Sequence, residues 1–569
     1  MTKYIVVVGG VISGVGKGVT TASIGRVLKE RGFSVTAVKI DPYINYDAGT
    51  LRPTEHGEVW VTNDGGEIDQ DLGNYERFLG EDIPKRNNIT TGQVYKAVID
   101  RERAGKYLGK TVQFIPHIPE EIKNRVKAAS KNKDFVLIEI GGTIGDFENV
   151  PFLFAMKSLE RELGGDVIYV LVTYLPVPSH IEEMKTKPTQ QAIRMLSENG
   201  IFPDLIICRS KRRLDDVRKK KIETYANIRS DHVISEPDID TIYRIPLDLE
   251  KDKIGDKVLK LFRMKSRKKP KWKEWSKVVN NIVNPKRKIK IAMIGKYVDI
   301  GDFSLTDSYI SINHSLQIAG AALNTKVEIG WIDAKKLEKG DYLKKLSNYD
   351  GVLVPGGFGS SGVEGKIKAA GYARKHNIPY LGLCYGMQLA IVEFARNVCG
   401  MEGANTAEVN PKTKYPVIDI LPMQKELIAK SRYGGTMRLG AYAAMLKKNS
   451  RVLKLYKDTN RIKEDKERIK KFKRDKQQHF RLGVLKAGDV VLERHRHRYE
   501  VNPEFVSQIE EKGMVFSGYH ERTDGTKLME FIELPKHKFY FATQGHPEFK
   551  SRFGDPAPLF LGFVKACLR

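Results

Sequence analysis

The first half of the chain opens with KYIVVVGGVISGVGKGVTTASIGRVLKE, residues 3–30. Residues 3–9 are a short run rich in β-branched side chains that ends in glycine, and residues 16–30 carry a helical pattern. A strand, a glycine-rich loop and a helix in this order are typical of a parallel α/β sheet. We therefore expect a doubly wound α/β domain to begin here.

Similar runs of buried-strand character recur along the first half, with helix-like stretches between some of them. They lie at residues 34–40, 135–140, 167–173 and 204–208. Around residues 263–288 the periodicity gives way to a Lys/Arg/Pro-rich stretch, after which residues 289–294 open a second series of strands and helices. The sequence thus predicts two doubly wound, mostly parallel α/β domains, at residues 1–270 and 289–569, with a linker at 271–288.

Composition limits the class of protein. The 569 residues are 41% hydrophobic, which is enough to bury ordinary α/β cores. The apolar runs are far shorter than the roughly 20 residues of a membrane span, and the first residues do not resemble a signal peptide. The 4 cysteines have no CxxC spacing and predict neither a disulfide framework nor a zinc site. We expect a cytoplasmic protein in which one cysteine can serve as a nucleophile.

The formal net charge of +27 favours polyanionic partners, which include nucleic acids and nucleoside triphosphates. Part of the excess belongs to residues 447–481, which hold 15 basic and 5 acidic residues. Lysines in this segment recur at helical spacing, at positions 463, 466, 470 and 473. They predict an exposed helix in a surface insertion that is dispensable for catalysis, and a solvated basic helix is a better interpretation than a nucleic-acid site.

The glycine-rich loop at residues 9–18 predicts a phosphate-binding site. Its glycines let backbone N–H groups turn toward a phosphate, Lys17 can reach the terminal phosphates, and the helix N-terminus adds its dipole. The loop departs from the usual pattern because Gly18 follows Lys17, where Ser or Thr normally offers a hydroxyl to Mg²⁺. Thr20 or Thr21 could substitute for that hydroxyl.

Without the usual hydroxyl, carboxylates must hold the ion. Asp71 lies in the string IDQDLG and Glu139 near the end of the strand-like string FVLIEIGG. Hard oxygen ligands suit Mg²⁺, although each residue alone could equally be a helix cap or a solvated side chain.

The string LGLCYG, residues 381–386, predicts a nucleophile elbow at Cys384, because a tight strand-to-helix turn needs glycines on both sides of the nucleophile. A buried structural cysteine is the alternative, but it would not require both glycines. Downstream, His546 and Glu548 follow a predicted strand and supply a base and an orienting group. With the N–H groups of the glycine loop at 355–359, the set resembles class I glutamine amidotransferases.

Longer strings resemble the CTP synthase family essentially from end to end. They are KIDPYIN (39–45), HGEV (56–59), EIGGTIGD (139–146), KTKPTQ (185–190) and ERHRHRYEVN (493–502). The resemblance implies an amidoligase domain followed by a class I glutaminase domain. It further implies ATP-dependent amination of UTP to CTP, with ammonia taken from glutamine, through a 4-phosphoryl-UTP intermediate and a glutamyl thioester on Cys384. Mg²⁺, GTP activation, CTP feedback inhibition, an internal ammonia passage and a homotetramer are also implied, with filaments left open.

The resemblance also implies roles for single residues. The implied ATP contacts are Gly14, Val15, Gly16, Lys17, Gly18, Val19, Lys39, Asp71, Pro237, Asp238 and Ile239. The implied UTP and CTP contacts are Ser13, Asp146, Phe147, Glu148, Lys185, Thr186, Lys187, Pro188, Thr189, Gln190 and Lys221. The implied glutamine contacts are Gly357, Tyr385, Gly386, Met387, Gln388, Glu408 and Arg498. Cys384, His546 and Glu548 match the triad, and Asp71 and Glu139 match the Mg²⁺ ligands.

Two departures and two rivals accompany this interpretation. The stretch between residues 416 and 434 is compact and basic where the family commonly has a longer lid, which leaves GTP activation open, and residues 447–481 have no obvious counterpart.

A different amidoligase acting on a carboxylate would lack KTKPTQ. A filament or nucleic-acid-binding protein built on a retired enzyme is disfavoured because Lys17 and the triad are intact.

Overall fold

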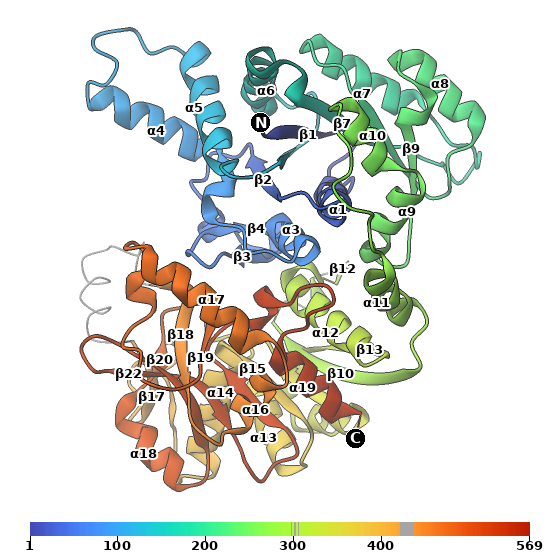
Figure 1. Ribbon diagram of the computed structural model, residues 1–569. Helices are drawn as coiled ribbons and strands as arrows, with labels where there is room; N and C mark the ends of the chain where they lie inside the picture. The colour runs from blue at the N-terminus through green and yellow to red at the C-terminus, as the bar shows by residue number, and fades with distance from the viewer. Residues whose placement is uncertain (297–298, 301–302, 305, 421–436, 569) are drawn as a thin grey trace. The chain divides into compact units, whose positions relative to one another are not determined.

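The computed structural model describes residues 1–296, 299–300, 303–304, 306–420 and 437–568. The chain forms two compact units (Figure 1). The first comprises Met1–Leu51 and Glu67–Val279, and the second comprises Arg52–Gly66 and Asn280–Arg569. A short segment from the first half of the chain therefore belongs to the second unit.

The first unit is built on a sheet in which every pair of neighbouring strands is parallel. Its order, over the described residues, is β5 (Asn88–Thr90), β2 (Val35–Asp41), β6 (Phe135–Ile140), β1 (Lys3–Gly9), β7 (Val167–Tyr174), β8 (Leu205–Ser210) and β9 (Val233–Pro237). The central strands are buried on both faces, which explains their continuous Val, Ile and Leu runs. The predicted α/β class is confirmed.

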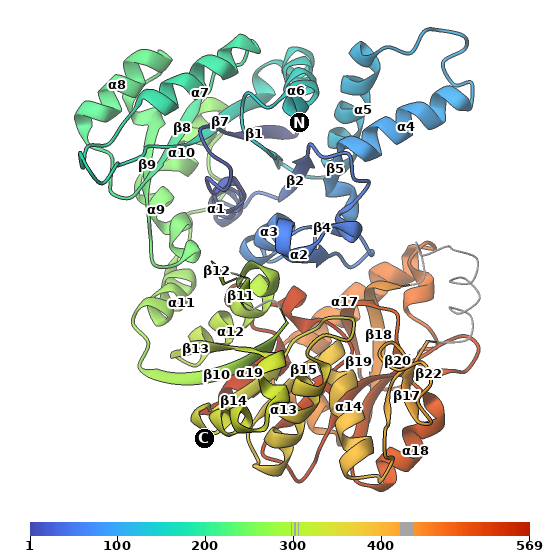
Figure 2. The ribbon, with the colours of Figure 1, turned by 180° about the vertical axis from the view of Figure 1, so that it is seen from behind.

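Helices cover both faces of this sheet (Figure 1, Figure 2). One layer contains α1 (Lys17–Glu30), α3 (Asp71–Leu79), α9 (Ile245–Lys251) and α10 (Ile254–Leu261). The other contains α4 (Thr91–Arg103), α5 (Phe114–Ala129), α6 (Val150–Leu163), α7 (Lys187–Glu198) and α8 (Asp216–Ala226). The stretch expected to be a linker contains α11 (Lys273–Val283), where Trp275 is buried and donates a hydrogen bond to the Tyr243 carbonyl oxygen (2.7 Å).

The second unit has a mixed sheet. Its order, as far as the chain is described, is β13 (Thr325–Asp333), β10 (Arg287–Gly295), β14 (Gly351–Val354), β15 (Tyr380–Leu383), β23 (Tyr540–Thr543), β22 (Lys527–Glu533), β21 (Val515–Glu521), β18 (Arg438–Leu446) and β19 (Val490–His497). Strands from β13 to β23 pair in parallel, and those from β23 to β19 pair antiparallel. The antiparallel half was not anticipated from the sequence.

The two faces of the second sheet carry separate cores. On one face lie α13 (Val363–Lys375), α14 (Tyr385–Asn397) and α18 (Pro503–Glu511); on the other lie α12 (Ile310–Ala322), α16 (Arg451–Lys457) and α19 (Pro558–Cys567). The remaining short elements are α2 (Pro53–His56), β3 (Val59–Val61), β4 (Glu67–Asp69), β11 (Asp299–Ile300), β12 (Phe303–Ser304), β16 (Asn405–Thr406), β17 (Pro416–Asp419) and β20 (Glu500–Val501). No helix within the described ranges combines the length and apolarity needed to cross a membrane.

The basic segment 447–481 is folded against the second unit. It forms α16 and α17 (Arg461–Arg474), and α17 packs on β19 (Figure 1). Ile462 and Ile469 are buried on the inner side of α17, together with Asp465, while the lysines at 463, 466, 470 and 473 face solvent. The predicted helix and its exposed lysines are present, but the expectation that the helix lies outside the core is wrong, because the high overall charge hides a buried face at helical spacing.

Asp465 makes this packing specific. Its carboxylate contacts the buried ammonium of Lys550 at 2.9 Å and accepts a hydrogen bond from the backbone N–H of Leu492 (2.9 Å). The Arg461 guanidinium donates to the carbonyl oxygen of Lys550 (2.9 Å). Since Lys550 follows the predicted triad residue Glu548 by two positions, the segment braces the chain next to the predicted site.

We expect Asp465→Ala to destabilise the second unit by about 3–5 kcal/mol, because it leaves the Lys550 ammonium buried and unpaired. The effect is measured from the unfolding transition of the second unit in urea. Glu467→Ala removes an exposed carboxylate from the same helix and should leave the midpoint unchanged. Equal midpoints for the two variants would show that the buried pair does not hold the segment.

Candidate functional site

Cys384 lies between β15 and α14 in a strained backbone conformation, with φ +49° and ψ −102°. A positive φ at a residue other than glycine is unusual and costs about 1–3 kcal/mol. A Cβ placed on Gly386 would lie 2.2 Å from the Val354 carbonyl oxygen, and one on Gly382 would lie 2.9 Å from the Ala542 side chain. The turn thus has the tight geometry of a nucleophile elbow, which both glycines permit.

His546 and Glu548 approach Cys384 from the loop after β23, where Pro547–Lys550 form a short 3₁₀ turn. The Nδ1 atom of His546 lies 2.7 Å from Oε1 of Glu548. A Cβ placed on Gly356 would be 3.0 Å from His546 Cε1 and 3.6 Å from Cys384 Cβ. The structure therefore brings the three predicted triad residues together, with a glycine of the 355–359 loop beside them.

The charges around His546 favour an imidazolium. Burial lowers its pKa, but the charge of Glu548 and then that of Cys384 outweigh the burial and raise the pKa to about 10. Within the described part of the chain, its Nε2 atom is buried without a hydrogen-bond partner. With Nδ1 directed to Glu548, this nitrogen is free to exchange a proton at Cys384.

Further predicted residues line the space beside Cys384. The Glu408 carboxylate accepts a hydrogen bond from Gly359 N–H (2.8 Å), and the Tyr385 hydroxyl donates to the Gly359 carbonyl oxygen (2.9 Å). Burial raises the pKa of Glu408 against the opposing effects of that N–H and of nearby cations. Met387 is completely buried, so it supports α14 from within the core.

One neighbour of the nucleophile was missed as a site residue. The side-chain amide of Gln544 lies 3.6 Å from the Cys384 sulfur, and its Oε1 accepts a hydrogen bond from Gln388 Nε2 (3.2 Å). The sequence presented Gln544 only as part of the turn before His546, and no local pattern indicates that a turn residue will reach back to the sulfur.

A segment from the first half of the chain packs behind His546, the predicted triad histidine. Trp60 is fully buried, and its ring lies 5.0 Å from that of Phe549, which in turn stacks on His546 at 5.2 Å. The Arg494 guanidinium lies over the Trp60 ring and donates a hydrogen bond to the Asn63 side-chain oxygen (2.7 Å). The carbonyl oxygen of Arg494 accepts a hydrogen bond from the backbone N–H of His546 (2.7 Å). Residues 56–59 form one of the strings that resemble the family, but no role was predicted for this segment.

The glycine loop of the first unit carries Lys17 at the start of α1. The Lys17 ammonium donates to the Gly142 carbonyl oxygen (2.6 Å), and burial lowers its pKa. Of the two hydroxyls considered as Mg²⁺ ligands, that of Thr20 donates to Glu236 (3.2 Å), whereas that of Thr21 is buried without a hydrogen-bond partner among the described residues.

Asp71 and Glu139 converge on one cation beside this loop. The Lys39 ammonium contacts Asp71 and lies 2.9 Å from Glu139. Burial lowers the pKa of Lys39, but the two carboxylates outweigh it and hold the pKa well above its usual value. A Cβ placed on Gly18 would lie 2.3 Å from Asp71 Oδ1. Glycine at position 18 thus gives the carboxylate the room that a Ser or Thr side chain would take.

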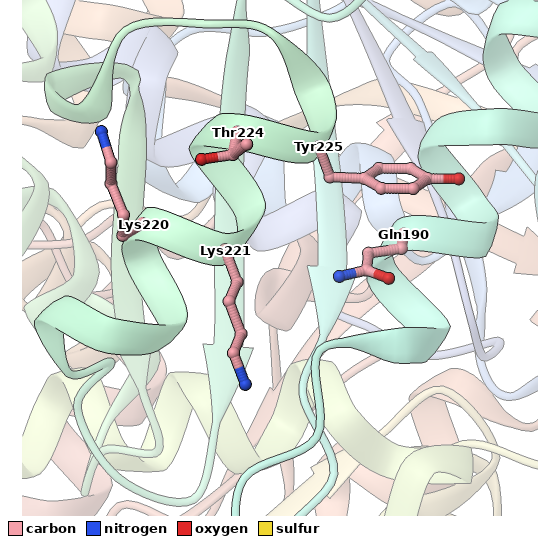
Figure 3. A pocket seen from close by; sticks show the side chains of 5 residues that line it. All are labelled: Gln190, Lys220, Lys221, Thr224 and Tyr225. Carbon is pink, nitrogen blue, oxygen red and sulfur yellow. The ribbon is translucent and has the colours of Figure 1, made fainter.

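A pocket of about 310 Å³ lies between α7 and α8 in the first unit (Figure 3). Its lining residues are Gln190, Lys220, Lys221, Thr224 and Tyr225. Only Gln190 and Lys221 were predicted, although Thr224 and Tyr225 follow Lys221 at the i+3 and i+4 spacing of one helix face.

The other predicted pyrimidine contacts lie outside this lining. Asp146 accepts a hydrogen bond from Thr143 N–H (2.6 Å), and Phe147 beside it is exposed. Thr189 is fully buried, with its hydroxyl 3.0 Å from that of Thr173, so it anchors α7 to β7. The predicted ATP contacts Pro237, Asp238 and Ile239 begin at the last residue of β9, the edge strand of the sheet.

The family models and the curated relatives agree on one family. The model for the CTP synthase N-terminus matches residues 3–264, and that for class I glutamine amidotransferases matches residues 304–566. The CTP synthase of Methanocaldococcus jannaschii is 48% identical over 100% of this chain and 98% of its own length, and that of Pyrococcus abyssi is 47% identical with the same coverage. A solved structure titled Trypanosoma brucei CTPS glutaminase domain with bound acivicin is 33% identical, covering 49% of this chain and 94% of that chain, with a TM-score of 0.41.

We expect Gly18→Ser to weaken ATP binding by about tenfold or more, although it restores the usual hydroxyl position, because the new side chain collides with Asp71. Calorimetric titration with ATP measures the change. Gly165→Ser adds the same side chain to the first unit where nothing lies within 4 Å of the new Cβ, and should bind ATP like the parent. Parental affinity in Gly18→Ser would contradict the assigned reason for the glycine.

Proposed function

The chain belongs to the CTP synthase family and is a ligase of that type; we propose that it converts UTP to CTP with ATP and glutamine, through 4-phosphoryl-UTP and a glutamyl thioester on Cys384. The observation that carries the proposal is the meeting of Cys384, His546 and Glu548 in a chain related along its whole length to CTP synthases. Free ammonia should replace glutamine in the synthetic step.

In the first unit, ATP would place its phosphates on the glycine loop, where Lys17 offsets negative charge. Asp71 and Glu139 fit Mg²⁺, because this ion is commonly held by one or two carboxylates together with substrate phosphates. Bound there, the ion would neutralise charge during transfer of the phosphoryl group to the uracil 4-oxygen. That transfer turns a poor leaving group into a good one before ammonia attacks.

The pocket between α7 and α8 is our candidate for the pyrimidine nucleotide, either substrate UTP or inhibitor CTP. Lys221 provides an ammonium group for phosphates, and the Tyr225 ring offers a surface on which a base can stack (Figure 3). Lys220 points the other way and pairs with Glu223 at 3.1 Å. The Gln190 amide can both donate and accept, as recognition of a base edge requires.

In the second unit, the Cys384 thiolate would attack the amide carbon of glutamine, and the carbonyl electrons would move to oxygen. The candidates to stabilise that oxygen are the backbone N–H groups of Gly357, in the glycine loop, and of Tyr385, directly after Cys384 in the elbow. His546 would give a proton from Nε2 to the departing ammonia while Glu548 holds the ring. Water would then release glutamate from the thioester.

Several family properties complete the proposal: a homotetramer, GTP activation, CTP feedback inhibition, an internal ammonia passage and a cytoplasmic location. Most of the stretch whose compactness bears on GTP activation, from residue 421 onward, lies outside the described residues. Nucleic acid is not among the proposed partners.

Cys384→Ala should abolish glutamine-driven CTP synthesis and spare ammonia-driven synthesis, because the thiolate is needed only to release ammonia. CTP formation with each nitrogen donor, at saturating UTP and ATP, measures both. Cys399→Ala changes a cysteine outside the triad and should preserve both activities. Equal loss with both donors in folded Cys384→Ala would contradict the division of labour between the units.

Lys17→Ala should remove synthesis from either donor, because phosphoryl transfer comes before amination in both cases. The same two assays apply, and glutamine hydrolysis measured alone reports whether the second unit still works. Ammonia-driven synthesis at the parental rate would refute the assignment of the glycine loop to ATP.

A further inference from the structure

A buried lysine that no motif explains lies beside the glutaminase loop. Lys366, in the first turn of α13, is only 1% exposed. Its Nζ atom lies 3.4 Å from the position a Cβ on Gly357 would take, and 5.5 Å from the centroid of the Tyr385 ring. The ammonium is thus held between the glycine loop that precedes α13 and the residue that follows the nucleophile.

This ammonium lacks the partner that buried charges normally have. Among the residues that the structure describes, none accepts a hydrogen bond from it and no carboxylate forms an ion pair with it. Burying an unpaired cation is unfavourable, so such groups are rare unless they serve a site. A methionine would fill nearly the same volume without that cost.

The titratable groups around Lys366 come from four elements. Lys296, directly after β10, donates to the Phe358 carbonyl oxygen (3.2 Å). Glu408 bonds to Gly359 N–H, so its carboxylate is already engaged. Cys384 lies across Tyr385, and His546 beyond it carries a positive charge of its own. Of the two groups whose charges act on Lys366, Lys296 and Cys384, only Cys384 can carry a negative charge.

The charges that act on Lys366 agree with this arrangement. Burial lowers the pKa of Lys366 and Lys296 lowers it further, whereas Cys384 raises it, which leaves the pKa at about 8. The side chain is accordingly an ammonium at neutral pH and becomes a neutral amine in mildly alkaline solution.

We propose that Lys366 is a positioning residue for glutamine hydrolysis, whose buried ammonium favours the Cys384 thiolate and the negative charge that develops at the glycine loop during attack. The inference rests on the proposed glutaminase function and deepens it. Lys366 transfers no proton and forms no bond in this role; it acts through its electrostatic field from a buried position.

The test is the pH dependence of Cys384 alkylation in the full chain. Iodoacetamide is applied between pH 5 and pH 10, and the modified peptides are quantified by mass spectrometry, with Cys399 as the internal reference. Lys366→Met should raise the midpoint for Cys384 by about one pH unit, which slows alkylation at pH 7 about tenfold. Glutamine hydrolysis should fall by a similar factor, mainly in kcat. Lys375→Met, at the exposed end of the same helix, should match the parent.

Stability separates this role from a structural one. The pKa of Lys366 in the folded protein is lower than in the unfolded chain, so its burial is unfavourable below about pH 8 and the penalty fades as pH rises toward 10.5. Lys366→Met should therefore unfold at the same temperature as the parent or higher, with the largest gain below pH 8. A purely structural lysine predicts the opposite, a lower unfolding temperature.

The outcomes are distinguishable. A parent protein that does not hydrolyse glutamine would refute the proposed function itself. Hydrolysis by the parent, together with an unshifted Cys384 midpoint in folded Lys366→Met and Lys366→Gln, would overturn this inference alone. Failure of both variants to fold would also overturn it, because the inference requires that an uncharged side chain be tolerated at this position.

Discussion

Both candidate sites depend on one constraint: parallel strands all end at the same edge of their sheet. In the first unit the glycine loop follows β1, its neighbour β6 carries Glu139, and β2, on the other side of β6, carries Lys39. In the second unit the glycine loop follows β14, Cys384 follows β15 and His546 follows β23, which are again neighbours. Residues far apart in the chain thus meet at one edge, where loops are free to vary while the sheet fixes their ends.

The sequence predicted the parallel strands well because burial on both faces leaves an unmistakable apolar run, as in β1 and β6. It did not predict the antiparallel half of the second sheet. β18, with the sequence RLGAYAAML, is rich in alanine, and β21, VFSGYHE, contains glycine and polar residues, so neither shows strong strand character. The segment at 52–66 was equally hidden, because packing of Trp60 on Phe549 joins positions nearly five hundred residues apart.

Site residues could be predicted where the chemistry fixes their spacing along the sequence, but not where it requires only that side chains lie close together in the fold. The elbow at Cys384 has a local signature because its turn demands small neighbours. The approach of Gln544 to the same sulfur has none. Gly18 illustrates the difference: the sequence records a missing hydroxyl, and only the structure gives the reason, which is the carboxylate of Asp71 in the space a side chain would fill.

Two buried lysines of the second unit show why a shifted pKa does not by itself identify a functional residue. Burial lowers the pKa of both Lys366 and Lys550 to about 8. Lys550, however, meets the carboxylate of Asp465 at 2.9 Å, so its charge is compensated within the fold and serves to hold α17 against the sheet. Lys366 has no such compensation among the described residues, and the anion it faces is one that exists only when Cys384 is ionised. The same desolvation therefore supports structure at one lysine and chemistry at the other, and the partner, rather than the pKa, separates the two.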